Sequence, residues 1–482
     1  MKNIKKKYDS LSVPVKATFW FTVCNFMLRG ISFISVPLFA RYLPKEEYGI
    51  VTTYNAYRTL LFLFASFELH LGPYARGLIK FKGQEKNYTV MLLIISNLLS
   101  LVSFTVIFSL RAWFLALTDL NITILVLTYI VFLFLPAYSC WIYRRRFHYE
   151  YKKAVFATII YSLLVTAVPL VSILLYEKTA ILKIESMLIV EVLFCIPFYI
   201  LSIIRIDWKS WNKDFFRRVL RFIVPFTLPL VFHSLSYMIL EQMDRIMVKE
   251  MVGAAEAAIY SVAYGIASVV SIFHTSINQV YQPYRYKKME KGDFSTIRRT
   301  SNGLLLIFGC IIVLFVLVSP EAIKILFSDD YLEAIWIMPP ITTSIFFMFL
   351  YSIFVDIESY YEETKYVMYA SLISSLLNII LNYFGILRFG YYACGYTTLV
   401  SYIVFAILHY IFMRKVCKKK GIHESIIDKR FIMLISVMLL AVVFIVTLLY
   451  SHIFIRYALV FFIFIILLRN RNFIFEIIKG KN

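Results

Sequence analysis

Long apolar runs separated by short polar connections occupy almost the whole chain of 482 residues. A helix needs about 20 mainly apolar residues to cross a bilayer, and fourteen runs reach or approach that length. The pattern therefore predicts an all-α integral membrane protein with about 14 transmembrane helices. The predicted spans are 17–39, 50–71, 88–110, 121–143, 154–175, 184–204, 222–247, 259–282, 300–326, 333–357, 366–387, 390–413, 431–451 and 453–468.

The composition agrees with this pattern. Hydrophobic residues make up 61% of the chain and charged residues 16%, whereas about a quarter of the residues of a soluble globular protein are charged. The formal net charge of +21 would indicate nucleic-acid binding in a soluble protein. In a membrane protein, an excess of Lys and Arg mainly reflects which connections are cytoplasmic. We therefore expect no nucleic-acid partner.

Lys and Arg are distributed unevenly over the connections. The two tails and every second connection carry 38 of the 50, whereas the opposite connections carry 9. Membrane proteins concentrate these residues in cytoplasmic connections, so the bias predicts that both termini are cytoplasmic. The lysine-rich start resembles a signal peptide, but the apolar run after it is too long for one. We therefore interpret the lysine-rich start, residues 1–7, as a cytoplasmic anchor for the first helix.

The basic connection 205–221 divides the chain. Six spans precede it and six follow, with a final pair added, so we predict an N-terminal lobe (1–210), a C-terminal lobe (211–413) and a C-terminal helix pair (414–482). Both lobes begin on the same side of the membrane, which makes the predicted repeat parallel. No connection is long enough for a soluble catalytic domain.

The first two spans form a predicted hairpin with one arginine deep in each apolar run. Arg29 lies ten residues before the end of the first span and Arg58 eight residues into the second. At a rise of ~1.5 Å per residue, both lie roughly 12–15 Å below one membrane face. A lipid-facing arginine at that depth costs at least ~2.5 kcal/mol. The pair predicts a wet, cationic cavity inside the bundle, and the alternative is that nearby carboxylates neutralise both arginines.

Charged residues also fall inside later spans. Glu241 and Arg245 lie four residues apart on one face of the seventh span, with Asp244 between them. They predict either a charged gate that lines the cavity or a self-satisfied pair at the membrane interface. Glu191 in the sixth span is a candidate for ion coupling, because burial disfavours an ionised carboxylate. Its alternative role is to pair with one of the arginines. Arg245 is a third candidate substrate cation, and Glu241 and Asp244 are candidates for ion coupling or gating.

No pattern of an enzyme or a cofactor site is found in the chain. The six cysteines are not spaced for disulfides or for a metal, and no Gly-rich phosphate-binding loop is present. The acidic turn Asp329-Asp330 lacks the further acids that a metal-dependent glycosyltransferase needs. We therefore expect no enzymatic activity, no cofactor and no metal.

Three stretches together resemble a known family. They are the end of the first span with its turn (36–49), the seventh span with the start of the eighth (242–245 and 258–264), and the eleventh and twelfth spans (378–402). In order and spacing they resemble the polysaccharide and O-antigen flippases of the multidrug/oligosaccharidyl-lipid/polysaccharide exporter superfamily. That resemblance implies two six-helix lobes around a central cavity, plus the final helix pair.

The resemblance also implies a function. The expected substrate is an oligosaccharide on an undecaprenyl-type pyrophosphate carrier, moved by alternating access to the outer leaflet of a bacterial cytoplasmic membrane. Membrane lipids, a polysaccharide polymerase and chain-length machinery are the expected partners. Two alternatives stay open at this point: a related exporter of small molecules, and a membrane polymerase or ligase of the same pathway.

Overall fold

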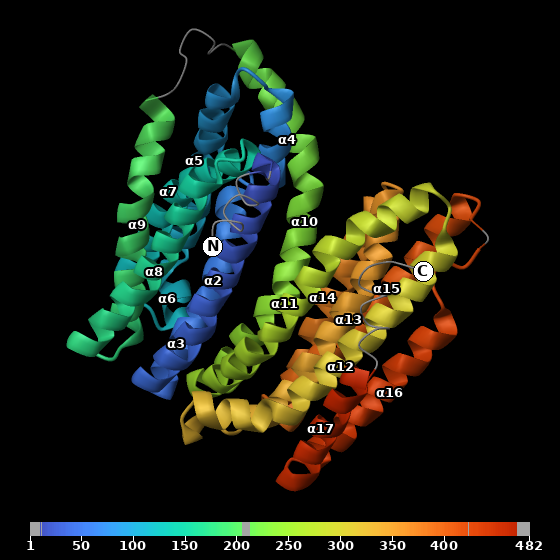
Figure 1. Cartoon of the computed structure of the whole chain (residues 1–482). Coiled ribbons are helices and arrows are strands. Elements are labelled where there is room, and N and C mark those ends of the chain that lie inside the picture. Colours follow the sequence, from blue (N-terminus) through green and yellow to red (C-terminus); the bar gives the residue numbers. More distant parts are fainter. Residues whose placement is uncertain (1–9, 11, 205–212, 423, 470–482) are drawn as a thin grey trace. The chain divides into compact units, whose positions relative to one another are not determined.

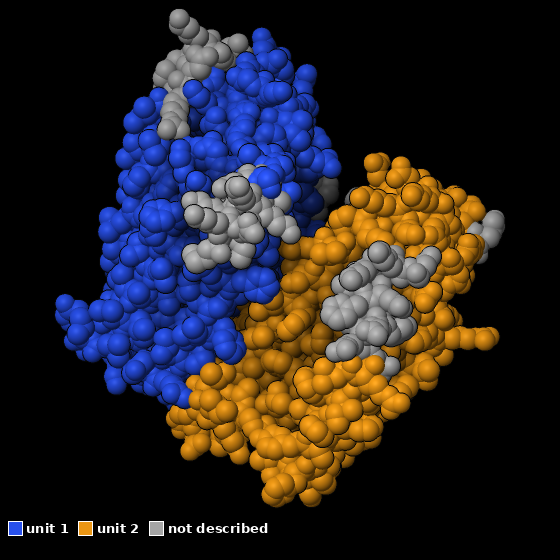
Figure 2. All heavy atoms as spheres, in the orientation of Figure 1, with its two compact units in different colours: residues 1–238 blue, residues 239–482 orange. Residues whose placement is uncertain are grey.

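The structure is a computed structural model that describes residue 10 and residues 12–204, 213–422 and 424–469. All regular secondary structure in these stretches is helical, and twelve helices have the length and apolar composition of membrane spans (Figure 1). The all-α membrane fold predicted from the sequence is therefore confirmed. The chain divides into an N-terminal unit (1–238) and a C-terminal unit (239–482) (Figure 2).

In the described residues of the N-terminal unit there are eight helices and the first part of a ninth. They are α2 (Val13–Tyr42), α3 (Lys45–Ser66), α4 (Gly72–Lys80), α5 (Glu85–Ser109), α6 (Arg111–Thr118), α7 (Ile122–Phe147), α8 (Tyr151–Leu175), α9 (Ala180–Ile204) and α10 (Lys213–Met251).

The described part of the C-terminal unit holds the remainder of α10, seven further α-helices and one short 3-10 helix. These are α11 (Ala254–Glu290), α12 (Phe294–Leu326), η2 (Asp329–Tyr331), α13 (Ala334–Tyr360), α14 (Thr364–Phe389), α15 (Ala393–Lys419), α16 (Lys429–Leu448) and α17 (Ile453–Arg469).

Each of the fourteen predicted spans coincides with a helix. Twelve of these helices are apolar throughout a membrane-spanning length; the other two are α3, which is more polar, and α17, whose apolar part Ile453–Ile466 is shorter. The predicted boundary between residues 210 and 211 lies in 205–212, outside the described residues. It stays a prediction.

The short helices α4 and α6 were not predicted. The prediction searched for apolar runs that could cross a bilayer, and both helices are too short for that. Helix α4 is amphipathic and turns Tyr74 and Leu78 into the core of the N-terminal unit. The Tyr74 ring stacks on Tyr88 of α5 with 6.0 Å between ring centroids, and the Tyr88 hydroxyl donates to the Pro73 carbonyl at 2.8 Å. Helix α4 therefore extends the core beside the spans.

The start of α10 completes the same core. Phe215, Val219 and Ile223 are buried in one cluster with Tyr74 and Tyr88. On the outer side of α4, the Arg76 guanidinium lies 4.8 Å from the ring centroid of Phe226, and the Lys80 ammonium lies 4.4 Å from that of Phe222. Cation–π contacts at exposed sites contribute about 0.5–1 kcal/mol each, so they add to the apolar packing between α4 and α10.

Helix α13 is the central element of the C-terminal unit. It packs along α15, α11 and α12, and nearly all of its apolar side chains are buried. Helices α16 and α17 pack on α12. The Arg456 guanidinium donates to both carboxylate oxygens of Glu321, at 2.8 and 2.7 Å. This bidentate pair fixes α17 to α12.

Local capping explains where several helices begin. The side chains of Asn121, Asp293 and Asp428 accept hydrogen bonds from backbone N–H groups in the first turns of α7, α12 and α16. Such caps satisfy donors that a helix leaves unpaired. The Lys288 ammonium, which lies 2.7 Å from the carboxylate of Asp293, holds the pKa of that carboxyl below its usual range.

Candidate functional site

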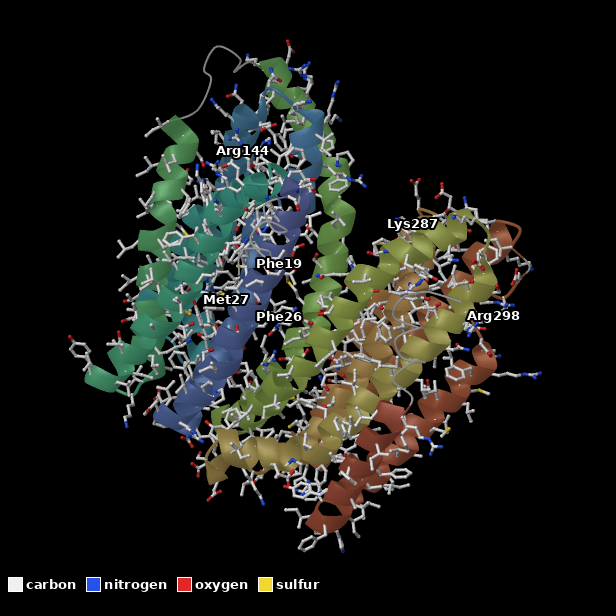
Figure 3. All side chains as sticks on the ribbon, viewed as in Figure 1. Phe19, Phe26, Met27, Arg144, Lys287 and Arg298 are labelled. Carbon is white, nitrogen blue, oxygen red and sulfur yellow. The ribbon has the colours of Figure 1, made fainter. Side chains whose placement is uncertain are left out.

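Arg29 lies in the interior of α2 and is half-buried. Among the residues that the structure describes, none forms a hydrogen bond or ion pair with its guanidinium. The neighbouring Phe26 and Met27, labelled on α2 in Figure 3, are exposed side chains. Arg29 is therefore a cation within an apolar helix that has no anionic partner in the described part of the chain.

Arg58 has such a partner. Its Nη2 lies 2.5 Å from a carboxylate oxygen of Glu191 on α9, and the Tyr161 hydroxyl of α8 donates to the other oxygen at 3.0 Å. Glu191 is 3% exposed. The structure thus brings together two of the predicted site residues. It also realises the alternative in which Glu191 pairs with an arginine.

Lys183 was missed as a site residue, because its charge placed it in a connection before the sixth span. The structure begins α9 at Ala180 and leaves Lys183 only 6% exposed. Its ammonium lies 3.8 Å from the Met187 thioether and 5.1 Å from the ring centroid of Phe39. Lys183, Met187 and Glu191 lie at successive i, i+4 positions, so they share one face of α9.

The polar groups inside the N-terminal unit are therefore unbalanced in charge. Arg58 pairs with the carboxylate of Glu191, Lys183 adds a second buried cation on α9, and Arg29 adds a further guanidinium on α2. No described contact joins Arg29 to Arg58. Because an isolated charge is costly to bury, this surplus is suited to an anionic ligand.

Asp244 is the centre of a polar cluster in the C-terminal unit. Its carboxylate is fully buried and accepts hydrogen bonds from the hydroxyl of Tyr260 on α11, from the amide of Asn382 on α14 at 2.6 Å, and from the hydroxyl of Thr398 on α15 at 2.6 Å. Asn378 and Thr397 extend the cluster through Asn382. Four helices thus converge on one acid.

The Asp244 cluster lies where the sequence predicts ion coupling or gating. Carboxylate, amide and hydroxyl oxygens are the ligands that hard cations prefer, and a buried carboxylate can instead take up a proton. Groups of three or more His, Cys, Asp and Glu that could hold a metal do not occur in the described ranges. The described cluster is a set of hydrogen-bond donors around one carboxylate, and its role in ion coupling stays a prediction.

Arg245 follows Asp244 in the chain but has different surroundings. Its Nη1 donates to the backbone carbonyl of Glu241 at 2.9 Å and to the side-chain oxygen of Gln242 at 2.7 Å. Its guanidinium carbon lies 4.3 Å from the ring centroid of Tyr264. Arg245 therefore contacts groups of its own helix and an aromatic ring. The roles of Arg245 and Glu241 in transport or gating stay predictions.

Two further buried pairs in the C-terminal unit were not predicted as pairs. Arg285 of α11 lies 2.5 Å from the carboxylate of Asp356 on α13, and His409 of α15 lies 3.1 Å from that of Glu358. In each pair the partners lie more than fifty residues apart in the sequence, so spacing along one helix gives no signal for them. They join α11 to α13 and α13 to α15.

A sequence model of the polysaccharide biosynthesis protein family matches residues 15–289, more than half of the chain. The chain belongs to the polysaccharide biosynthesis protein family. A model of the MatE family also matches, over residues 229–384. The resemblance predicted from three short stretches is therefore confirmed at the level of the superfamily.

Two curated relatives of this family member come from Haemophilus influenzae. One, named an uncharacterized membrane protein, is 26% identical over 200 residues, which are 40% of this chain and 48% of that protein. The other, named Lsg locus putative protein 1, is 24% identical over 182 residues, which are 36% of this chain and 43% of that protein. The chain spans about half the length of the curated relatives it matches.

Solved structures of two transport proteins share the fold of this family member. The lipid II flippase MurJ in an inward closed conformation matches with a TM-score of 0.66 at 16% identity, over 95% of this chain and 100% of that chain. An inward-facing multidrug resistance transporter of the MATE family matches with a TM-score of 0.65 at 12% identity, over 82% of this chain and 96% of that chain. The chain therefore has the fold of the multidrug/oligosaccharidyl-lipid/polysaccharide exporter superfamily.

Proposed function

We propose that this protein is a flippase for undecaprenyl-pyrophosphate-linked oligosaccharides. It moves repeat units from the inner to the outer leaflet of a bacterial cytoplasmic membrane for the synthesis of O-antigen, capsule or exopolysaccharide. Membership of the polysaccharide biosynthesis protein family and the fold shared with a lipid II flippase support this substrate class. The 38-to-9 distribution of Lys and Arg supports cytoplasmic termini.

The surplus of positive charge inside the N-terminal unit carries the proposal. Arg29 has no anionic partner in the described residues, and the described contacts of the Lys183 ammonium are with the Met187 thioether and the Phe39 ring. A pyrophosphate must leave water to cross the membrane, and fixed guanidinium groups can bind its oxygens with charge-assisted, bidentate hydrogen bonds. In this proposal Arg29 and Lys183 bind the carrier pyrophosphate, and Arg58 joins them when Glu191 releases it.

The proposal assigns ion coupling to Asp244. An ion or proton that binds there changes the hydrogen bonds among α10, α11, α14 and α15, because all four helices contribute to the cluster. Such binding shifts the transport cycle only as far as the ion binds one conformation more tightly than another. Arg245 and Glu241 lie on the same end of α10 and act as a gate in this scheme.

Deletion of the gene in the bacterium that carries it tests this function. We expect intact lipid-linked repeat units to accumulate in the inner leaflet, inaccessible to an impermeant sugar-oxidising reagent until the cells are lysed. Expression of the wild-type chain should restore surface polysaccharide. Unpolymerised repeat units exposed on the outer leaflet of the deletion strain would indicate a polymerase instead.

Replacement of Arg29 by alanine tests the cation that has no described partner. We expect Arg29→Ala to lower polysaccharide export about 10- to 100-fold, because a hydrogen bond to a charged group contributes roughly 1.5–3 kcal/mol. Membrane abundance should stay near normal, since no described carboxylate loses its partner. Arg29→Lys should restore export only in part, because lysine lacks the planar fork.

Asn25→Ala, one turn earlier on α2, is the matched control and should export normally. Both quantities are measured in the same cells: abundance by immunoblot of membranes, and export by surface polysaccharide. Normal export by abundant Arg29→Ala protein would contradict a role for Arg29 in substrate binding.

A further inference from the structure

A pocket of about 460 Å³ lies where the connection after α15 folds back over the end of that helix. Met413 of α15 and Ile426 and Ile427 of the connection line it, and all three side chains are buried. Helix α15 ends at Lys419 and α16 begins at Lys429. Since both helices span the membrane, this pocket, which we call the α15 pocket, lies at the membrane boundary, at the level of lipid headgroups.

Three cations line the α15 pocket: Arg414, Lys415 and Lys418. Within the described ranges, no hydrogen bond or ion pair engages the side chains of Arg414 and Lys418. The pocket's one acid, Glu424, lies 3.1 Å from the guanidinium of Arg298 on α12, which is labelled in Figure 3. The charge of this acid is already compensated, so the pocket presents a positive potential.

An apolar stripe on α15 leads to these cations. Ile407 and Ile411 are both 52% exposed, and Lys415 and Lys418 continue the same face at helical spacing. A membrane-spanning helix that exposes such residues turns them toward acyl chains. Acyl chains along the stripe would place their own headgroup at the cations, an arrangement that a free phosphate ion does not need.

We propose that the α15 pocket binds the headgroup of an anionic phospholipid. Arg414 and Lys418 contact its phosphate, Lys415 adds positive charge at the rim, and the acyl chains lie along Ile407 and Ile411. Basic pockets at the membrane boundary next to transmembrane helices are suited to anionic headgroups. The site lies within the C-terminal unit and does not depend on the transport function proposed above.

Native mass spectrometry of the purified full-length chain in detergent tests this site. The probes are phosphatidylglycerol and, as a zwitterionic comparison, phosphatidylethanolamine. We expect wild-type protein to bind phosphatidylglycerol more tightly, and Arg414→Gln/Lys418→Gln to lose about 25-fold in that affinity. Each Lys or Arg near an anionic lipid contributes roughly a factor of five, so two account for this loss.

Lys429→Gln/Arg430→Gln is the matched control. It removes the same charge from exposed positions at the start of α16 that do not line the pocket. The control should bind phosphatidylglycerol like the wild type. Equal losses in the two double variants, or no loss in either, would overturn the proposal, because binding would then follow diffuse surface charge. Displacement of the lipid by millimolar inorganic phosphate would also overturn it in favour of a soluble anion.

Glu424→Gln is expected to raise the affinity for phosphatidylglycerol, the opposite of the double variant's effect. It therefore tests the site even if Arg414→Gln/Lys418→Gln is unstable. It removes the pocket's acid and frees Arg298, so we expect phosphatidylglycerol to bind at least about fivefold more tightly. Unchanged or weaker binding by this variant would contradict the site. Size-exclusion profiles and unfolding temperatures check that every variant is folded.

Discussion

Arg58→Ala is expected to reduce the amount of folded protein in the membrane sharply. The substitution leaves Glu191, which is 3% exposed, without its guanidinium partner. Removal of one member of a buried ion pair costs about 3–5 kcal/mol, comparable to much of the stability of a marginally stable unit. Arg298→Ala is the control, because it breaks an ion pair whose side chains are 34% and 50% exposed. Exposed pairs contribute only about 0–1 kcal/mol.

The double variant Arg58→Met/Glu191→Met separates folding from transport. Replacement of both charges by apolar side chains of similar size is often neutral or stabilising, so we expect near-normal abundance and unfolding temperature. If Arg58 also binds the pyrophosphate, this folded protein should still fail to export polysaccharide. Normal export by the double variant would show that the pair serves only to hold α3 against α9.

Asp244→Asn is expected to leave a folded protein that responds much less to an ion gradient. Asparagine nearly matches the shape of aspartate, but it removes the negative charge and turns an N–H group either toward the amide of Asn382 or toward the hydroxyls of Tyr260 and Thr398. Coupling between two sites usually amounts to about 1–3 kcal/mol. We therefore expect the gradient-dependent part of transport to fall roughly 5- to 150-fold.

The measurement is transport into the outer leaflet of vesicles with an imposed proton or sodium gradient, and without one. Asp329→Asn, an exposed acid in the turn after α12, should behave like the wild type. A gradient response retained in Asp244→Asn would place coupling elsewhere. Tyr260→Phe, which removes one donor and keeps the charge, should give an intermediate loss.

The helices could be predicted from the sequence because each apolar run must satisfy its own backbone hydrogen bonds in lipid, whichever neighbours it has. The short helices α4 and α6 escaped prediction because their role is to pack beside the spans. Lys183 was placed outside the membrane since a charge ends an apolar run. Its burial depends on Phe39 of α2 as well as on Met187 of its own helix, and no pattern along α9 alone reveals the contact with Phe39.

The candidate site could be predicted only in part for a similar reason. Arg29, Glu191 and Asp244 stand out as single charges in apolar runs. The partner of Arg58, however, lies 133 residues away, and the sequence left open whether that arginine was paired. Tyr260 and Thr398 do not stand out in the sequences of their own helices. Their role as donors to Asp244 is visible only once α10, α11 and α15 are packed together.

The core of the N-terminal unit sets a rule for making chimaeras of related chains. Phe215, Val219 and Ile223 of α10 pack with Tyr74 and Tyr88, although they follow the sixth span in the sequence. In a chimaera joined between residues 210 and 211, the α10 side chains would come from one parent and Tyr74 and Tyr88 from the other. The two sides of this core would then no longer be matched to each other. A junction at 238/239, in register within α10, keeps each unit with the residues that fill its interior. Exchange of halves, by recombination or in the laboratory, therefore preserves packing when the junction falls inside a helix rather than in the connection before it.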